Sequence, residues 1–153
     1  MSGRLLALVG TVVLLAGPLA AVGVSPAGAT VYPNVATEAA LRTAFDDPTA
    51  TQIDLSADIT LSSVCPNGKV DRTSAAAVAV VVDGHGHTVT QTCTTGSSAV
   101  FHANFSDMTF QNITITGGGG TVGSTGGIDA SGGGSVSLTN STVSGNTSIG
   151  IAP

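Results

Sequence analysis

Apolar and polar residues alternate with a period of two along most of the chain, and this alternation predicts short β-strands. Three segments align without gaps at a spacing of 28 residues, and a fourth fits one step earlier at 27. These segments are Ile53-x-Leu55-x-Ala57, Val80-x-Val82-x-Gly84, Met108-x-Phe110-x-Asn112 and Val136-x-Leu138-x-Asn140. Because alternate side chains of a strand point to opposite faces of a sheet, the paired apolar residues predict a buried face that recurs in every segment.

The third position of three aligned segments predicts a corner of the chain. It holds Gly84, Asn112 and Asn140, residue types that tolerate a left-handed backbone better than most. We therefore expect one strand to turn into the next at this column, where stacked Asn amides can satisfy one another's hydrogen bonds.

A second predicted strand follows each corner and places an apolar residue between two hydroxyl residues. The segments are Thr60-Leu61-Ser62, Thr88-Val89-Thr90, Thr114-Ile115-Thr116 and Thr142-Val143-Ser144, at spacings of 28, 26 and 28. We expect the apolar residues to form one core column and the hydroxyl residues to point outward. That column is Leu61, Val89, Ile115 and Val143.

The repeat predicts the fold class. Each unit consists of a strand, a corner, a second strand and a longer Gly-rich return, such as residues 117–120 or 132–134. A β-sandwich would instead show hairpin signals about every 8–12 residues. We therefore predict an all-β solenoid, a parallel β-helix of about four coils.

The residues before the repeat predict an export signal and a cap. Residues 1–29 have a basic start, an apolar stretch from Leu5 to Ala16, and the small-x-small pattern Ala27-Gly28-Ala29, as in a secretory signal peptide. The alternative is an uncleaved membrane anchor, although the apolar stretch is shorter than the ~20 residues of a span. Residues 30–48 are expected to form an N-terminal cap and residues 49–153 the coils.

The cap is expected to contain one short helix, from Thr37 to Phe45. Thr37 is the expected N-cap, and Glu38 lies in the first turn, where an acidic side chain is favourable. The sequence Asp46-Asp47-Pro48 ends the helix. Its apolar stripe consists of Ala40, Leu41, Ala44 and Phe45.

The composition narrows the class of protein. Only 8% of the 153 residues are charged, against roughly a quarter in an ordinary soluble domain. Four basic residues against nine acidic ones argue against a nucleic-acid partner, which needs a basic surface. A hydrophobic share of 42% is too high for a disordered chain. Stacked columns of neutral residues explain the low charge, because like charges one strand spacing apart would repel.

The two cysteines fit the same repeat. Cys65 and Cys93 are 28 residues apart, which is one coil. Equivalent positions in adjacent coils lie ~4.8 Å apart, within the Cα separation that a disulfide accepts. Such a disulfide would stabilise an exported chain by about 3–4 kcal/mol. The alternative is two free buried thiols.

Two long segments resemble a known superfamily. Met108 to Gly118 (MTFQNITITGG) and Gly126 to Thr147 (GGIDASGGGSVSLTNSTVSGNT) resemble the coils of secreted right-handed parallel β-helix proteins of the pectin-lyase-like superfamily. Val81 to Thr90 (VVDGHGHTVT) resembles an early coil of these proteins, and Thr37 to Leu61 resembles their capping helix and first coil. The resemblance covers about residues 35–151. It implies a right-handed helix and raises the expectation of an enzyme that acts on acidic polysaccharides.

The chain departs from that superfamily in length. Its members usually have ten or more coils, whereas this sequence stops at Pro153, at what looks like the start of a fifth coil. We therefore expect an N-terminal fragment or a truncated member. A solenoid end without a polar cap leaves an open stacking edge, so the alternative is a genuine short solenoid whose last coil self-associates edge to edge with a second copy.

The outward columns of the first sheet hold no predicted catalytic group. Enzymes of this superfamily need acidic Ca²⁺ ligands with an Arg or Lys base, or clustered carboxylates, on one outer face. The alignment places Asp54, Val81, Thr109 and Ser137 in one outward column and Ser56, Asp83, Gln111 and Thr139 in the next. Neither column gathers two acids in adjacent coils.

The basic residues after the leader also lie away from these columns. Arg42 belongs to the cap helix, and Lys69 and Arg72 follow Cys65 in a loop. We therefore expect no catalytic residue in this chain and no cofactor. The alternative is the N-terminal part of a polysaccharide lyase or glycoside hydrolase whose catalytic coils lie beyond Pro153.

The sequence Asp83-Gly-His-Gly-His contains three candidate metal ligands, namely Asp83, His85 and His87. Alternate residues of a strand share a face, so both imidazoles could bind one ion. The alternative, which we favour, is a pair of solvent-exposed histidines in a Gly-containing turn.

The outward hydroxyl residues predict a flat, uncharged face. This possible hydroxyl binding face consists of Thr60, Ser62, Thr88, Thr90, Thr114, Thr116, Thr142 and Ser144. Such a face suits carbohydrate, and in some β-solenoids it binds ice; the alternative is that Thr is simply a good polar strand former. We predict an exported protein with a structural or binding role at the cell surface or outside the cell, with carbohydrate or the cell envelope as its partner.

Overall fold

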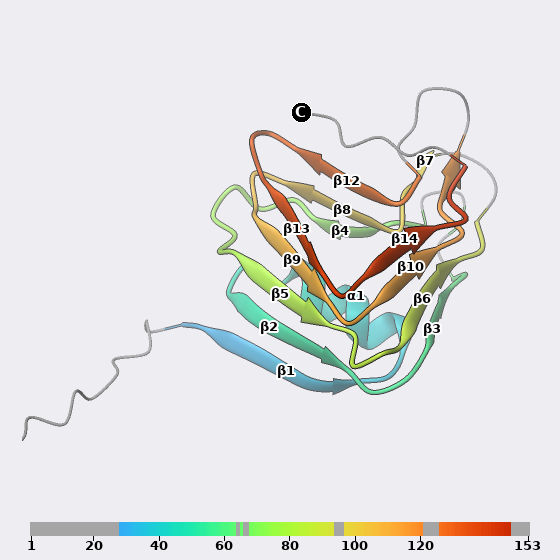
Figure 1. Ribbon diagram of the computed structural model, residues 1–153. Coiled ribbons are helices and arrows are strands. Elements are labelled where there is room, and N and C mark those ends of the chain that lie inside the picture. The colour runs from blue at the N-terminus through green and yellow to red at the C-terminus, as the bar shows by residue number, and fades with distance from the viewer. Residues whose placement is uncertain (1–27, 64, 66–67, 94–96, 121–125, 148–153) are drawn as a thin grey trace, which may run out of the picture.

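The computed structural model describes residues 28–63, 65, 68–93, 97–120 and 126–147, and these residues form a parallel β-helix. Three parallel sheets surround one core, and from β2 onward, strands that follow one another in the sequence lie in different sheets (Figure 1). Neighbouring strands within a sheet therefore come from adjacent coils. The predicted fold class, an all-β solenoid of parallel strands with one short N-terminal helix, is confirmed.

Sheet A contains five strands in the order β1-β2-β5-β9-β13. The strands are β1 Thr30–Val35, β2 Ala50–Leu55, β5 Val80–Asp83, β9 Met108–Gln111 and β13 Val136–Thr139. Val80 pairs with Met108 and Met108 with Val136, which is the predicted 28-residue register. The cap contributes a strand, β1, that the alternation did not predict.

The predicted register of the first coil is wrong by two residues. Ile53 pairs with Val82, not with Val80, and Asp54 pairs with Asp83. A shift of two residues leaves every side chain on the same face of the sheet. The pattern of apolar and polar residues therefore cannot distinguish the two registers. The outward columns of sheet A are in fact Gln52, Val81, Thr109 and Ser137, and Asp54, Asp83, Gln111 and Thr139.

Sheet B contains four strands in the order β14-β10-β6-β3. The strands are β3 Ile59–Leu61, β6 Thr88–Gln91, β10 Thr114–Thr116 and β14 Thr142–Ser144. The last three have the predicted register, with Val89, Ile115 and Val143 in one column. In β3 the same two-residue error recurs: Ile59 continues this column, and Leu61 lies beside Gln91.

Sheet C closes each coil on the third side, in the segment that was predicted as a Gly-rich return. Its strands are β4 Val70–Arg72, β8 Phe101–Asn104 and β12 Ile128–Ser131. Val70, Phe101 and Ile128 form a buried column. The short strands β7 (Ser97–Ser98) and β11 (Gly119–Gly120) form a separate antiparallel pair.

Helix α1 spans Glu38–Asp46 and packs against strands of all three sheets at the N-terminal end of the solenoid. The Thr37 hydroxyl accepts a hydrogen bond from the Ala40 N–H at 3.2 Å, which confirms the predicted N-cap. Leu41, Ala44 and Phe45 are buried. Ala40, which was predicted to lie on the apolar stripe, instead lines a surface hollow and is exposed.

Aromatic rings connect the helix to the coils through the core. The Phe45 ring centroid lies 5.2 Å from that of Phe101, which lies 4.8 Å from that of Phe110. All three rings are tilted relative to one another and completely buried. Contacts of this kind add about 0.5–1.5 kcal/mol per pair beyond the burial of their area.

Arg72 is a completely buried cation at an inward position of β4, not a loop residue as predicted. Its partner in β8 is Ala103, and this small residue leaves room for the longer side chain. The guanidinium donates hydrogen bonds of 2.6–3.3 Å to the main-chain carbonyls of Phe45, Asp47, Pro48, Ala50 and Val78, and Nε donates one to the Ser106 hydroxyl at 3.2 Å. Arg72 thereby ties the C-terminal end of α1 to the first coil, where a cation also complements the helix dipole.

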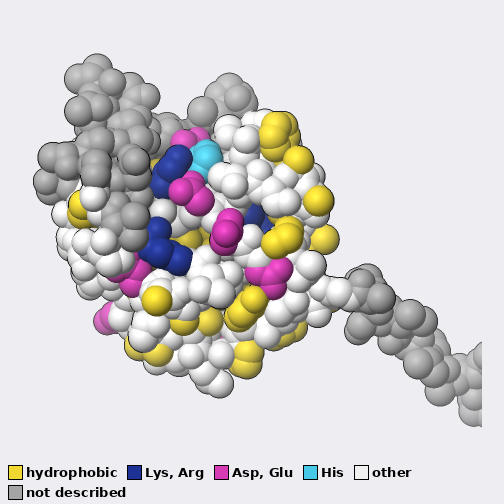
Figure 2. All heavy atoms as spheres, turned by 180° about the vertical axis from the view of Figure 1, so that it is seen from behind, with side chains coloured by type: hydrophobic (Ala, Val, Ile, Leu, Met, Phe, Trp, Pro, Cys, Tyr) yellow, Lys and Arg dark blue, Asp and Glu magenta, His cyan; other side chains and the backbone are white. Residues whose placement is uncertain are grey.

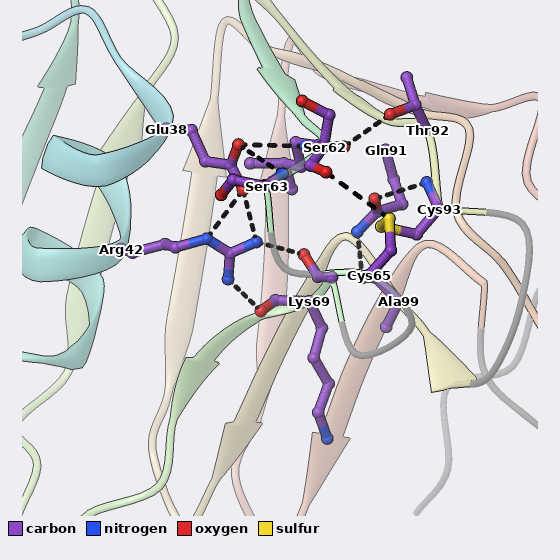
Figure 3. The surroundings of a disulfide bond; sticks show 12 residues. Glu38, Arg42, Ser62, Ser63, Cys65, Lys69, Gln91, Thr92, Cys93 and Ala99 are labelled. Atoms are coloured by element: carbon purple, nitrogen blue, oxygen red, sulfur yellow. Dashed lines mark hydrogen bonds and ion pairs between the residues drawn. A yellow bond between two sulfur atoms is a disulfide. The ribbon is translucent and has the colours of Figure 1, made fainter.

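The disulfide between Cys65 and Cys93 joins adjacent coils beside the start of α1, with a Cα–Cα distance of 5.4 Å (Figure 3). Glu38 accepts hydrogen bonds from the Ser62 and Ser63 N–H groups at 3.1 Å each and pairs with Arg42 at 2.8 Å. Arg42 also donates to the carbonyls of Gly68 and Lys69 at 2.6 Å. The helix is therefore held against the loop that contains Cys65.

The predicted leader lies almost wholly outside the described residues, which begin at position 28, so it remains a prediction, as do the domain boundaries. Within the described ranges, no helix is long and apolar enough to cross a membrane. Residues 148–153 also lie outside these ranges, and with them the predicted start of a fifth coil.

Candidate functional site

The corrected register brings two carboxylates together on the outer face of sheet A. Asp54 at the end of β2 and Asp83 at the end of β5 occupy the same column in adjacent coils. The predicted alignment had separated them, and had thereby excluded a pair of acids from this face. Both residues lie next to the corner where sheet A turns into sheet B (Figure 1).

Amide and backbone donors orient both carboxylates. Asp83 accepts hydrogen bonds from the Gln111 side chain at 2.9 Å, the Asn112 side chain at 3.1 Å and the His85 N–H at 2.9 Å. Gln52 donates to Asp54 at 2.6 Å. Burial acts to raise the pKa of Asp83, but these hydrogen bonds outweigh it and the pKa is lowered. Asp83 is therefore a fixed anion whose side chain is only 13% exposed.

His85 completes a cluster of three metal-ligating side chains. Its Nε2 lies 3.7 Å from Asp54 Oδ1, and its Nδ1 lies 3.8 Å from Asp83 Oδ1. One ligand atom from each of the three residues lies within 4.8 Å of the others. Among the residues that the structure describes, this is the one group of three or more such side chains.

His87, the third predicted ligand, lies outside this cluster. Its Nδ1 is 3.2 Å from Asp58 Oδ1, which also accepts the Thr88 N–H at 2.9 Å. The side chains of His85 and His87 thus bind different carboxylates, because they lie in a turn and not on a strand. The third side chain of the cluster is therefore Asp54, and not His87 as predicted. The sequence did not reveal Asp54 as a candidate ligand, because the predicted register of β2 was wrong.

The predicted corner column has two left-handed members, not three. Asn112 and Asn140 have φ angles of 51° and 50°. In the coil of Gly84 the left-handed residues are His85, with φ 49°, and Gly86, with φ 90°. This corner is two residues longer than that of the next coil, which accounts for the spacing of 26 between Thr88 and Thr114 against 28 between Thr114 and Thr142. Gly84 is required for a different reason: a Cβ there would lie 2.5 Å from Ile113.

The outer face of sheet B carries the predicted hydroxyl columns, except that the residues from β3 are shifted by two positions. Thr60, Thr90, Thr116 and Ser144 lie in one column. Thr88, Thr114 and Thr142 form the second, and Asp58, not Thr60, precedes them. Ser62 follows the end of β3 and belongs to neither column.

The hydroxyls of these two columns are available to a ligand. Within the described residues, none of the seven side chains makes a hydrogen bond to another protein atom. By contrast, the hydroxyl of Thr92, which directly follows β6, donates to the Leu61 carbonyl at 2.9 Å. Equivalent hydroxyls of adjacent coils are ~4.8 Å apart. Sheet B therefore presents a grid of donors and acceptors that no partner within the described chain occupies. We call it the hydroxyl face.

A second group of charged side chains lies on the face that Figure 2 shows. On the outer face of sheet C, Asp71, His102 and Asp129 form one column, and His102 Nδ1 lies 2.8 Å from Asp71. Lys69 lies 3.5 Å from both Asp71 and His102. Burial acts to raise the pKa of Asp71, but His102 and Lys69 outweigh it and the pKa is lowered. The neighbouring hollow of about 320 Å³ is lined by Arg42, Thr43, Asp46 and Asp71.

The cations of the described chain lie away from the Asp54–Asp83 pair. Arg42 is paired with Glu38 on α1, Lys69 lies beside sheet C, and Arg72 is enclosed in the core. The carboxylate pair therefore has no Arg or Lys beside it that could act as a base within the described residues. Together with His85, the pair contains residue types that can bind a metal ion.

Comparison with known proteins gives one result. A family model described as a pectate lyase-like adhesive domain matches residues 32–149, which is most of the chain. No curated protein and no solved structure matches it.

Proposed function

The chain belongs to the pectate lyase-like adhesive domain family, and from this premise we propose that it is an adhesive module that binds carbohydrate through the hydroxyl face. The family supports a surface or adhesive role. The finer proposal, carbohydrate as the partner and sheet B as the site, rests on the seven unengaged hydroxyls in register across four coils.

The charge of the chain narrows the class of carbohydrate. The sequence has nine acidic and four basic residues, and one of those four, Arg72, is buried. The hydroxyl face itself carries a single charge at its edge, that of Asp58. A neutral glycan can form hydrogen bonds to such a face without charge repulsion, whereas an acidic polysaccharide would approach a protein of the same sign. We therefore expect a preference for neutral glycans.

Export to the cell surface or beyond is part of this proposal. It is supported by the predicted leader, by the disulfide and by the family's adhesive description. The predicted alternative, the N-terminal part of a polysaccharide lyase or hydrolase, finds its strongest support in the Asp54–Asp83 pair. The positions of Arg42, Lys69 and Arg72 speak against that pair as an acid–base site within the described chain.

The test compares binding of the purified chain to an immobilised neutral glucan and to an acidic galacturonan. In the variant Thr90→Val/Thr116→Val, two central hydroxyls are replaced by methyl groups of similar shape on strands that Val favours. We expect this variant to bind the glucan at least tenfold more weakly. Thr109→Val, at an outward position of sheet A, is the matched control and should bind like the unmodified chain.

Two outcomes would overturn the proposal. If the double variant retains full binding, sheet B is not the site. If the unmodified chain binds neither polysaccharide, carbohydrate is not the partner and only the adhesive role remains.

A further inference from the structure

We propose that Asp54, Asp83 and His85 bind a divalent transition-metal ion, for which Zn²⁺ is the probe. This site is separate from the hydroxyl face and does not depend on the proposed function. It combines two carboxylate oxygens with one imidazole nitrogen, a ligand set used for zinc and related ions. Calcium and magnesium prefer sites built from oxygen alone.

The three side chains are close enough to share one ion after a small rotation of the imidazole, because one ligand atom from each lies within 4.8 Å of the others. His85 Nε2 lies 3.7 Å from Asp54, and the other ring nitrogen, Nδ1, lies 3.8 Å from Asp83, both too far for hydrogen bonds. Metal–ligand bonds of about 2.1 Å in a tetrahedral site place neighbouring ligand atoms ~3.4 Å apart. The imidazole is 55% exposed and can rotate to present one nitrogen to both carboxylates.

Side-chain amides donate hydrogen bonds to both carboxylates and fix their orientation. Gln52 donates to Asp54, and Gln111 and Asn112 donate to Asp83. Such partners fix the orientation of metal ligands and commonly affect affinity by a factor of 10–100. The three amides come from two coils on either side of β5: Gln52 lies on β2, and Gln111 and Asn112 lie at the end of β9 and in the corner that follows it. Stacking of the coils therefore assembles both the ligands and their supports.

The alternative is a simple ion pair, in which a protonated His85 offsets one of the two carboxylate charges. This arrangement needs no metal, and its distances are within the range of a weak ion pair. The two interpretations predict different responses to zinc. The chain also provides a matched control, because His87 lies two residues away and faces Asp58.

The experiment is a calorimetric titration of the purified chain with ZnCl₂, with a purification tag that contains no histidine, followed by thermal unfolding with and without zinc. We expect saturable binding of one ion per chain and a higher melting temperature in zinc. His85→Asn should weaken binding at least tenfold, and so should Asp54→Asn. Asn tolerates the left-handed backbone of position 85, so the first variant should melt like the unmodified chain without zinc. His87→Asn should bind zinc normally.

Three results would overturn the proposal. The first is the absence of saturable binding up to millimolar zinc, which would leave the ion pair as the explanation. The second is equal loss of binding in His85→Asn and His87→Asn, which would mean adventitious binding by the turn. The third is calcium binding that His85→Asn does not affect, which would assign the carboxylates to an oxygen-only site.

Discussion

Phe110 and Leu138 occupy the same inward column in adjacent coils, yet Phe110 is completely buried and Leu138 is 47% exposed. Phe110 has described strands on both sides within sheet A, β5 and β13. β13 is the outermost described strand of that sheet. In a solenoid, a residue is therefore buried because a neighbouring coil covers it, and not because of its own type.

The two ends of the described solenoid differ in the same way. At the N-terminal end, α1 covers the core, and the buried Arg72 and the Glu38–Arg42 pair hold it there. At the other end, the core side of β13 and β14 presents Val136, Leu138 and Val143, which are partly or largely exposed. Edge-to-edge self-association at this coil remains a prediction. At the N-terminal end, several of the few charges of this chain hold the cap against the coils.

The largest expected effect separates the two members of the shared column. Phe110→Ala should lower the free energy of unfolding by about 4 kcal/mol, because it removes a buried ring and leaves a cavity. Leu138→Ala should lower it by about 1 kcal/mol or less, since half of that side chain is already in water. Urea unfolding followed by circular dichroism measures both. Equal losses would contradict the view that burial in this column depends on the neighbouring coil.

The second-largest expected effect tests whether Arg72 holds α1 against the first coil. Arg72→Met should lower the free energy of unfolding by about 3 kcal/mol, because the carbonyls that bind the guanidinium would stay buried without donors. Arg72→Lys should recover part of this loss. A loss below about 1 kcal/mol in the Met variant would show that water replaces the guanidinium and that Arg72 is not required to hold α1.

The smallest expected effect concerns how the contribution of Glu38 to stability depends on pH. Burial acts to raise the pKa of Glu38, but the hydrogen bonds from Ser62, Ser63 and Arg42 outweigh it and the pKa is lowered. A group with a lowered pKa in the folded state stabilises the protein above its unfolded pKa of about 4.3, and this contribution is lost as the pH falls through the lower folded value.

Glu38→Gln should therefore cost about 1 kcal/mol at pH 7 and less at pH 3, where the unmodified chain has lost part of the same contribution. Urea midpoints at the two pH values measure the difference. A cost that does not change with pH would mean that the charge of Glu38 contributes nothing to the attachment of α1.

The sequence predicted most of the fold because repetition gives many independent observations of each column. The spacing of 28 between Met108 and Val136, and the Val89–Ile115–Val143 column, were both correct. The first coil was placed two residues out, since such a shift preserves the alternation of inward and outward residues. This single error separated Asp54 from Asp83 and gave Leu61 the position of Ile59.

The candidate sites were harder to predict than the fold, because they depend on side chains from different coils. The hydroxyl columns could be predicted, since their residues repeat with the strands. The Asp54–Asp83–His85 cluster could not, because it requires the register of β2 and the conformation of one longer corner. The burial of Arg72 had no signal in the alternation, as a charged residue was assigned to a loop by its type alone.

The disulfide has a mechanical consequence for a chain placed under tension. A chain pulled from its two ends lengthens as its coils peel away. Residues between Cys65 and Cys93 cannot contribute to that lengthening, because the covalent bond bypasses them. At ~3.4 Å per extended residue, about 90 Å of contour is withheld for this separation of 28 residues. The coil that the disulfide closes can therefore lengthen by less than the coils further along.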